Sequence, residues 1–260
     1  MTEAHVWYEI HDRTAWIRID RPERRNALAT ATVQQLTEAF VRAGEDPEVW
    51  AVVLTGAGDR AFCAGGDLKE MDETARSGRD IHVPMTGLYR NMFEIMLETY
   101  KPTIAAVNGA ALAGGCELML SCDIRVAVEG VAIGLPEAKR GMGANLGSVL
   151  LPRLMPRAVA LELLYTGRSI TAEEARSWGL VNRVVPRADF DTEVKALVSE
   201  ITANAPLTLR RYKEMAVKGW DLPVQTALRL NVGPNPYLSE DRVEGVRAFV
   251  EKRSPQWRGR

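Results

Sequence analysis

Two glycine pairs and two glutamates are the residues of this chain whose types and spacing best suit catalysis. Gly65-Gly66 and Gly114-Gly115 each follow an apolar run typical of a buried strand and precede a predicted helix. The first N–H groups of a helix lack intrahelical partners and carry partial positive charge, and glycine allows close approach to them. Two such loops that converge would direct two donors at one oxygen and stabilise a carbonyl that gains negative charge. Taken alone, each pair is better explained as a turn or a tight packing contact than as part of an active site.

The two glutamates supply groups for proton transfer. Glu117 lies three residues after Gly114, on roughly the same side of the first helical turn, and its neighbours are apolar. Burial there would raise the pKa of its carboxyl toward the range useful for acid–base catalysis. Glu137 directly follows an apolar run and Pro136. Simpler interpretations exist, because an acid in a first turn also favours the helix dipole and an exposed Glu137 would pair with a nearby cation.

Alternating strands and helices must position these groups. Period-2 and continuous apolar runs predict strands, and period-3.6 runs predict helices. The strands are expected at 6–10, 14–19, 50–56, 102–109 and within 123–135, and the helices at 30–43, 85–100 and 114–121. After residue 146 the pattern is mostly helical, with an interruption at 179–185. This order predicts an α/β or α+β domain with one hydrophobic core.

Composition excludes several classes of protein. The 260 residues carry a formal net charge of -1, which argues against nucleic acid as a partner. No apolar run reaches 18 residues, so we expect no membrane span. The three cysteines and the absence of a signal sequence at the N-terminus predict reduced thiols in a cytoplasmic protein. H-E-x-x-H and C-x-x-C do not occur, so no metal site is expected.

One competing motif is a dinucleotide fingerprint. The stretch Gly56–Ala61 satisfies G-x-G-x-x-G/A after a predicted strand. Its mechanism requires a helix to begin there and meet the pyrophosphate. Gly65-Gly66 follows within a few residues and disfavours such a helix, so we regard a nicotinamide or flavin enzyme as a distant alternative.

Several blocks of the sequence together resemble the enoyl-CoA hydratase/isomerase (crotonase) superfamily. The resemblance extends over nearly the whole chain, and its central block is long and specific. Some details, namely LPEAK, NAPL and the terminal EKRSPQWRGR, resemble the carnitinyl-CoA dehydratase branch. The matching blocks are RPERRNAL (21–28), AFCAGGDLKEM (61–71), KPTIAAVNGAALAGGCELMLSCD (101–123), GLPEAKRGM (134–142), TGRSITAEEARSWGLVNRVV (166–185) and AFVEKR (248–253).

This resemblance implies an α/β fold, a crotonase-like spiral of ββα units with a C-terminal helical region. We expect residues 1–195 to form the spiral core and residues 196–260 to form a helical oligomerisation region. The implied assembly is a homotrimer or a dimer of trimers.

The resemblance also implies a reaction. The matching positions make Gly66 and Gly114 the oxyanion hole and Glu117 and Glu137 the acid–base pair of an enoyl-CoA hydratase, a lyase that reversibly adds water to an α,β-unsaturated acyl-CoA. Coenzyme A is then part of the substrate, and no separate cofactor is expected. A double-bond isomerase would need only Glu137, and a non-catalytic binding module would need neither glutamate.

Further positions in the matching blocks are expected to contact the substrate. Asn145 stands where the hydratases have a glycine that helps to hold the catalytic water, which puts simple straight-chain hydration in doubt. Phe249 and Lys252 are expected near the adenine of a neighbouring subunit's coenzyme A. Residues 72–98 are expected to shape the pocket, and Met85, Leu88, Tyr89 and Met92 within them fit core or oligomer contacts as well as substrate walls. The expected substrate contacts are Arg24, Arg25, Ala64, Asp67, Leu68, Lys69 and Asn145.

Overall fold

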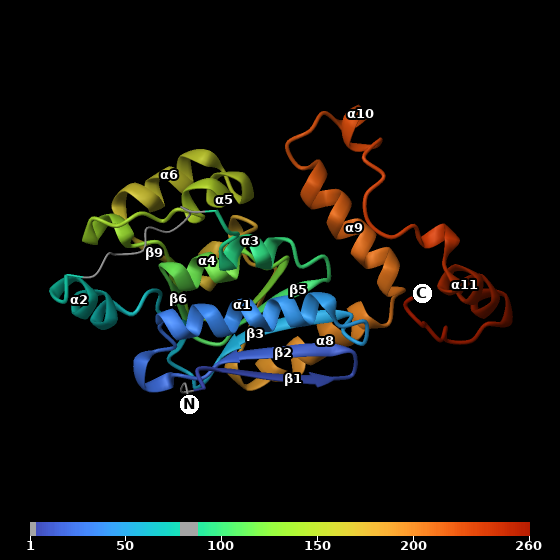
Figure 1. Cartoon of the computed structure of the whole chain (residues 1–260), viewed down its shortest axis with the longest axis horizontal. Helices are drawn as coiled ribbons and strands as arrows, with labels where there is room; N and C mark the ends of the chain where they lie inside the picture. Colours follow the sequence, from blue (N-terminus) through green and yellow to red (C-terminus); the bar gives the residue numbers. More distant parts are fainter. Residues whose placement is uncertain (1–3, 79–87) are drawn as a thin grey trace.

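The computed structural model describes residues 4–78 and 88–260, and it contains two sheets. The larger sheet has the strand order β1-β2-β3-β5-β7-β10 (Figure 1). Its strands are β1 (Val6–His11), β2 (Thr14–Ile19), β3 (Ala51–Gly56), β5 (Thr103–Val107), β7 (Ile124–Val128) and β10 (Arg183–Val185). β1 pairs antiparallel with β2, and the following neighbours are parallel.

The central strands of this sheet are covered on both faces, which explains their continuous apolar sequences. Val52 and Leu54 of β3 belong to the core on one face, and Ala51 and Val53 belong to the core on the other. Helix α1 (Thr30–Glu45) contributes Phe40 to the first core, and helix α8 (Phe190–Thr202) packs against the second.

A smaller sheet is formed by short strands that each follow a long one. These are β4 (Ala61–Cys63), β6 (Ala110–Leu112) and β8 (Ala132–Gly134), with β9 (Ser169–Thr171) at the edge. β4, β6 and β8 are parallel neighbours. A helix follows each of them, namely α2 (Leu68–Arg76), α4 (Gly114–Leu120) and α5 (Gly147–Leu154). The repeated unit is therefore strand, strand, helix, as the resemblance implies.

The loop after β3 does not have the form that a dinucleotide site requires. β3 ends at Gly56, and the chain enters strand β4 at Ala61 without an intervening helix. Gly56 is required by packing, since a Cβ there would lie 2.3 Å from the carbonyl oxygen of Phe62. The fingerprint in this stretch is therefore coincidental.

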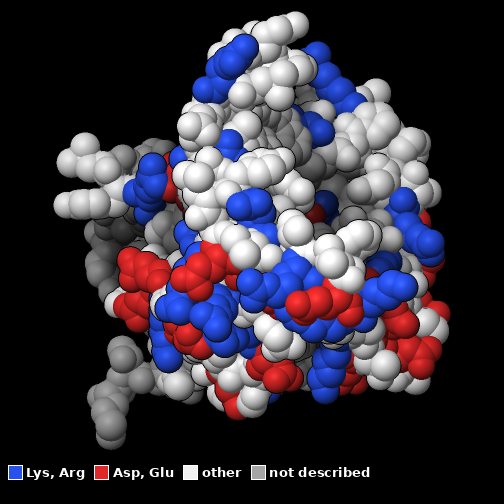
Figure 2. All heavy atoms as spheres, turned by 90° about the vertical axis from the view of Figure 1, so that its right-hand side faces the viewer, with Lys and Arg blue, Asp and Glu red and all other residues white. Residues whose placement is uncertain are grey.

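The C-terminal helices extend to one side of the two sheets (Figure 1). They are α9 (Pro206–Gly219), the short α10 (Val224–Ala227) and α11 (Glu240–Glu251). α9 is anchored by the buried Lys213, whose Nζ lies 2.8 Å from Asp123 Oδ2. Figure 2 views the molecule from this side and shows uncharged areas above a belt of mixed charges.

The expected division after residue 195 falls inside α8. Val194 and Leu197, one on each side of it, belong to the same buried cluster. Neither this division nor an oligomerisation role for residues 196–260 is tested by the chain alone, and both stay predictions. Within the described ranges, none of the helices is long and apolar enough to cross a membrane.

The remaining helices pack beside elements that are already described. α3 (Met92–Leu97) packs beside α1, and α6 (Arg157–Thr166) packs beside α5. The short α7 (Ala172–Ser177) follows β9. Short 3-10 turns lie at Pro22–Arg24, Glu137–Arg140, Arg187–Asp189 and Pro236–Leu238.

Candidate active site

The two glycine pairs meet because β4 and β6 are parallel neighbours. Their carboxyl ends lie at one edge of the smaller sheet, which is where α/β proteins commonly bind ligands. A Cβ built on Gly65 would lie 3.2 Å from the amide nitrogen of Gly114. A Cβ built on Gly114 would lie 3.9 Å from the amide nitrogen of Gly66. The structure thus brings together the two amides that the sequence proposed as an oxyanion hole.

Gly65 and Gly115 are required by the local structure, whereas Gly66 is not. Gly65 has a φ of 91°, which other residues rarely adopt, and a Cβ on Gly115 would lie 2.0 Å from the Cys63 carbonyl oxygen. At Gly66 the nearest atom to a Cβ would be the sulfur of Met71, at an ordinary 3.5 Å. The need for an unusual backbone conformation therefore explains Gly65, and tight packing explains Gly115. Neither reason explains the glycine at position 66.

The Gly66 amide points away from the segment that holds it. Gly66 forms a parallel bridge with Leu28, in which the Leu28 N–H donates to the Gly65 carbonyl at 2.8 Å and the Asp67 N–H donates to the Leu28 carbonyl at 3.0 Å. In a parallel bridge the middle residue of one partner makes neither bond, so its own N–H faces the opposite side. The Gly66 amide is thereby directed away from Leu28.

The Gly114 amide opens helix α4 after a strained residue. Gly114 is the first helical position, where an N–H has no intrahelical partner. Ala113 before it has a φ of 51° and a ψ of -128°, a region that is almost restricted to glycine. Such strain persists only where the surrounding structure imposes it, and here it sets the direction in which α4 begins.

Glu117 lies one turn into α4 and is 6% exposed. Burial raises the pKa of Glu117 from 4.5 to about 7 and the charge of Glu137 adds to this, while a hydrogen bond from the Gly147 amide opposes it. That amide donates to Glu117 Oε1 at 2.9 Å. The carboxylate is therefore held at one oxygen by the first residue of α5, and its pKa suits proton transfer near neutral pH.

Glu137 follows β8, the next parallel neighbour of β6, so it lies at the same edge as the glycine pairs. It is 6% exposed, and its buried Oε2 has no hydrogen-bond partner in the described part of the chain. Burial raises the pKa of Glu137, although its own amide and Arg140 oppose the effect. A buried carboxyl oxygen without a partner is costly, which points to a role in binding or chemistry.

Gly147 was not among the residues singled out from the sequence. Its N–H holds Glu117, and a Cβ on Gly147 would lie 2.5 Å from Leu135 Cδ1. Asn145, two residues earlier, is half-buried, and its carbonyl accepts from Ser148. The sequence signal available for Gly147 was the glycine-rich stretch after Glu137, but that stretch does not show which of its amides meets the glutamate.

The residues expected to contact the substrate differ in their burial and in their hydrogen-bond partners. Asp67 is 5% exposed, and its carboxylate is occupied by Arg24 and by Arg21, a residue that the sequence did not single out. Ala64 is half-buried, and its amide donates to the carbonyl of Arg25 in the segment opposite. Arg25 itself is exposed, as are Leu68 and Lys69 at the start of α2.

The residues considered for the pocket wall lie in different environments. Met85 lies outside the described residues. Leu88 and Tyr89 are 98% and 91% exposed, whereas Met92 is buried in the hydrophobic core, which is the core alternative for this residue. Phe249 and Lys252 are both exposed, and their expected contact with a neighbouring subunit's coenzyme A stays a prediction.

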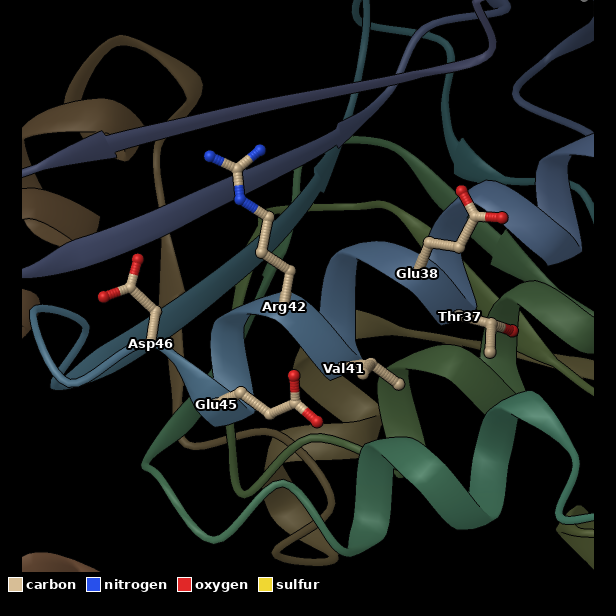
Figure 3. Close-up of a pocket in the computed structure, with 6 residues that line it drawn as sticks. All are labelled: Thr37, Glu38, Val41, Arg42, Glu45 and Asp46. Carbon is tan, nitrogen blue, oxygen red and sulfur yellow. The ribbon is translucent and has the colours of Figure 1, made fainter.

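A separate shallow pocket lies on the outer surface of α1 (Figure 3). Its lining comes entirely from this helix and its C-terminal cap, and it contains neither glutamate of the pair. Arg42 from this lining lies over the ring of Tyr8 at 4.3 Å. Among the described residues, no cluster of His, Cys, Asp and Glu side chains suits a metal ion.

Comparisons with known proteins agree with this geometry. The sequence profile of the family described as enoyl-CoA hydratase/isomerase matches residues 9–260. A carnitinyl-CoA dehydratase from Salmonella enteritidis is 39% identical over 251 residues, which cover 94% of each chain. An enoyl-CoA hydratase structure from Bacillus anthracis superposes with a TM-score of 0.88 at 32% identity, covering 99% of this chain and 100% of that one.

A second solved structure supports the same assignment. The enoyl-CoA hydratase from Mycobacterium tuberculosis superposes with a TM-score of 0.87 at 36% identity, again covering 99% of this chain and 100% of that one. The expected crotonase-like fold is confirmed by these superpositions. With a family profile and a curated relative that both cover almost the whole sequence, the chain belongs to the enoyl-CoA hydratase/isomerase family.

Proposed function

We propose that this protein is an enoyl-CoA hydratase-type lyase that reversibly adds water to an α,β-unsaturated acyl-CoA thioester. The observation that carries the proposal is the edge of the smaller sheet where β4, β6 and β8 end. Two backbone amides and two buried carboxyl groups with raised pKa values follow these three strands. Charge that develops on a thioester oxygen between the amides would be stabilised there, because such donors are fixed in advance in a water-poor site.

The chain's groups suffice for each step of hydration. Glu117, as the carboxylate, takes a proton from water while the water oxygen bonds to the β-carbon. The π electrons move to the thioester oxygen, which the amides of Gly66 and Gly114 hold as an enolate. Glu137, as the acid, then gives its proton to the α-carbon. In dehydration Glu137 takes the α-proton and Glu117 protonates the departing hydroxyl, so the pair exchanges roles.

Two glutamates favour a hydro-lyase over an isomerase. Isomerisation moves one proton between two carbons and needs one acid–base group, whereas hydration must also activate water. Here both carboxyls are buried, and burial together with the charge of Glu137 raises the pKa of Glu117, which supports a shared site for the two groups. Coenzyme A is proposed to enter as part of the substrate, with no separate cofactor.

A panel of thioesters tests the proposal. Purified protein is mixed with straight-chain enoyl-CoA substrates and with hydroxyacyl-CoA substrates, including carnitinyl-CoA because a dehydratase relative is named for it. We expect absorbance of the conjugated thioester to be lost in the hydration direction and to appear in the dehydration direction. A product with a shifted double bond and no added water would instead support the isomerase.

We also propose that the chain works as a homotrimer or a dimer of trimers. The support is the C-terminal region, where large apolar side chains are exposed, among them Leu228, Leu238 and Phe249 at 72%, 85% and 85%. Apolar patches of this kind commonly mark protein interfaces. Light scattering on the purified chain is expected to give three or six times the 28.7 kDa mass of the monomer. A monomeric mass would contradict the proposal.

A further inference from the structure

The carboxylate of Asp67, the residue after Gly66, has no capacity left for a substrate. Its Oδ1 accepts from Arg24 at 2.9 Å and from the amides of Lys69 and Glu70 at 3.2 and 3.4 Å. Its Oδ2 accepts from Arg21 and Arg24, each at 3.2 Å. A carboxylate offers about four lone-pair sites, so these five contacts saturate it. The Asp67 carboxylate therefore serves the protein's own structure, and the expected contact of this residue with the substrate stays a prediction.

Arg21 connects this carboxylate to the opposite segment. Its second guanidinium nitrogen donates to the Ala27 carbonyl at 2.6 Å, next to Leu28. Leu28 in turn holds Gly65 and Asp67 through the two backbone bonds of the parallel bridge. The chain on both sides of Gly66 is thus tied to residues 21–28 by backbone bonds and by the ion pairs of Asp67.

We propose that Arg21, Asp67 and Arg24 form a positioning clamp that sets the direction of the Gly66 amide and so the strength of the oxyanion hole. This inference rests on the proposed function, because it assigns the clamp to the reaction that the site is proposed to catalyse. The clamp does not touch the substrate. It acts through the Gly66 peptide, which lies between the clamped Asp67 and the bridge to Leu28.

The electrostatics of the clamp keep the Asp67 carboxyl ionised near neutral pH. Burial by itself would raise the pKa of Asp67, but hydrogen bonds from Arg24, the Glu70 amide and Arg21 outweigh it and hold that pKa below 3.8. The Arg21 and Arg24 side chains are only 12% and 31% exposed. Partly buried pairs of this kind are screened little by salt, so the clamp should hold its geometry at physiological ionic strength.

The test is Asp67→Asn. Asparagine caps a helix about as well as aspartate, so α2 keeps its N-cap while the charge that pairs with both arginines is lost. We expect kcat to fall about 10–100-fold, as for a catalytic group displaced by about 1 Å, while KM changes little. The direct readout is the infrared carbonyl stretch of a bound, carbonyl-labelled thioester, which should shift less from its frequency in solution than in the unaltered protein.

Two further variants guard against a simple folding defect. Arg21→Met removes one of the two arginines that pair with Asp67. Because the residues act as one unit, kcat of the double variant Asp67→Asn/Arg21→Met should be little lower than that of the slower single variant. Asp241→Asn is the matched control. It also neutralises a buried carboxylate at the start of a helix, where Asp241 accepts from the amides of Arg258 and Gly259, and it should leave the carbonyl shift intact.

The outcomes separate this inference from the proposed function. A raised KM with unchanged kcat and a full carbonyl shift in Asp67→Asn would contradict the proposed clamp. Such a result would show that Asp67 contacts the substrate instead. Loss of the shift in Asp241→Asn as well would also overturn it, because the effect would then be general. If the unaltered protein itself produces no carbonyl shift and no hydration, the proposed function fails instead.

Discussion

Glu117→Gln is expected to slow hydration by about 10²–10⁴-fold, the usual contribution of a general acid–base group. Glutamine has nearly the same shape, and its carbonyl oxygen can still accept from the Gly147 amide that now holds Glu117 Oε1 at 2.9 Å. What it lacks is a lone pair basic enough to take a proton from water. The loss should therefore appear in kcat as well as in kcat/KM, measured from the decay of conjugated thioester absorbance.

The pH profile gives this prediction a second readout. The pKa of Glu117 is about 7, so in the unaltered protein kcat/KM for hydration should fall tenfold per pH unit as the pH drops below about 7. The variant's residual rate should lack this decline. Because the two carboxyls interact, the profile reports apparent pKa values of the pair. A decline at the same pH in Glu117→Gln would show that another group controls it.

Stability provides the control for this variant. The pKa of Glu117 is higher in the folded protein than its ordinary 4.5, so its contribution to stability is complete below that value and is lost as the pH rises through about 7. The glutamine variant should therefore melt no earlier than the unaltered protein at pH 8. Glu137→Gln adds a functional comparison, because an isomerase activity would survive Glu117→Gln and disappear in Glu137→Gln.

Removing the Gly114 N–H is expected to cost about 10²–10³-fold in kcat, as for the loss of one oxyanion-hole donor. Gly114→Pro achieves this, since proline has no N–H and is tolerated at the first position of a helix, where Gly114 stands. We would introduce it together with Ala113→Gly. A residue before proline is restricted, and glycine accepts the φ of 51° that Ala113 has.

The matched control is Gly114→Ala in the same Ala113→Gly background. It keeps the N–H and adds a Cβ that would lie 3.1 Å from Leu28 Cδ1, the flexible end of a side chain. This variant should retain most of its activity and its carbonyl shift, whereas the proline variant should lose both. Equal losses in the two variants would mean that space at residue 114, and not its N–H, matters to the reaction.

Much of the fold was predictable because its signals are local. The continuous apolar runs of β3 and β5 and the helical period of α1 identify these elements directly. The three-residue strands β4, β6 and β9 were not recognised. A strand of three residues is too short to show periodicity, and it exists only because a neighbour from a distant part of the chain supplies its hydrogen bonds.

Part of the candidate site could be predicted from local sequence. Apolar neighbours predicted the burial of Glu117, the glycine pairs predicted accessible backbone amides, and the family resemblance selected Gly66 and Gly114 among them. Their relative positions could not be read from local sequence, because residues far apart in the chain meet through the parallel pairing of β4, β6 and β8. The tertiary structure also decided that Asp67 binds two arginines and that Gly147 holds Glu117. The partner of a flexible charged side chain or a loop amide depends on non-local geometry, which local sequence patterns do not encode.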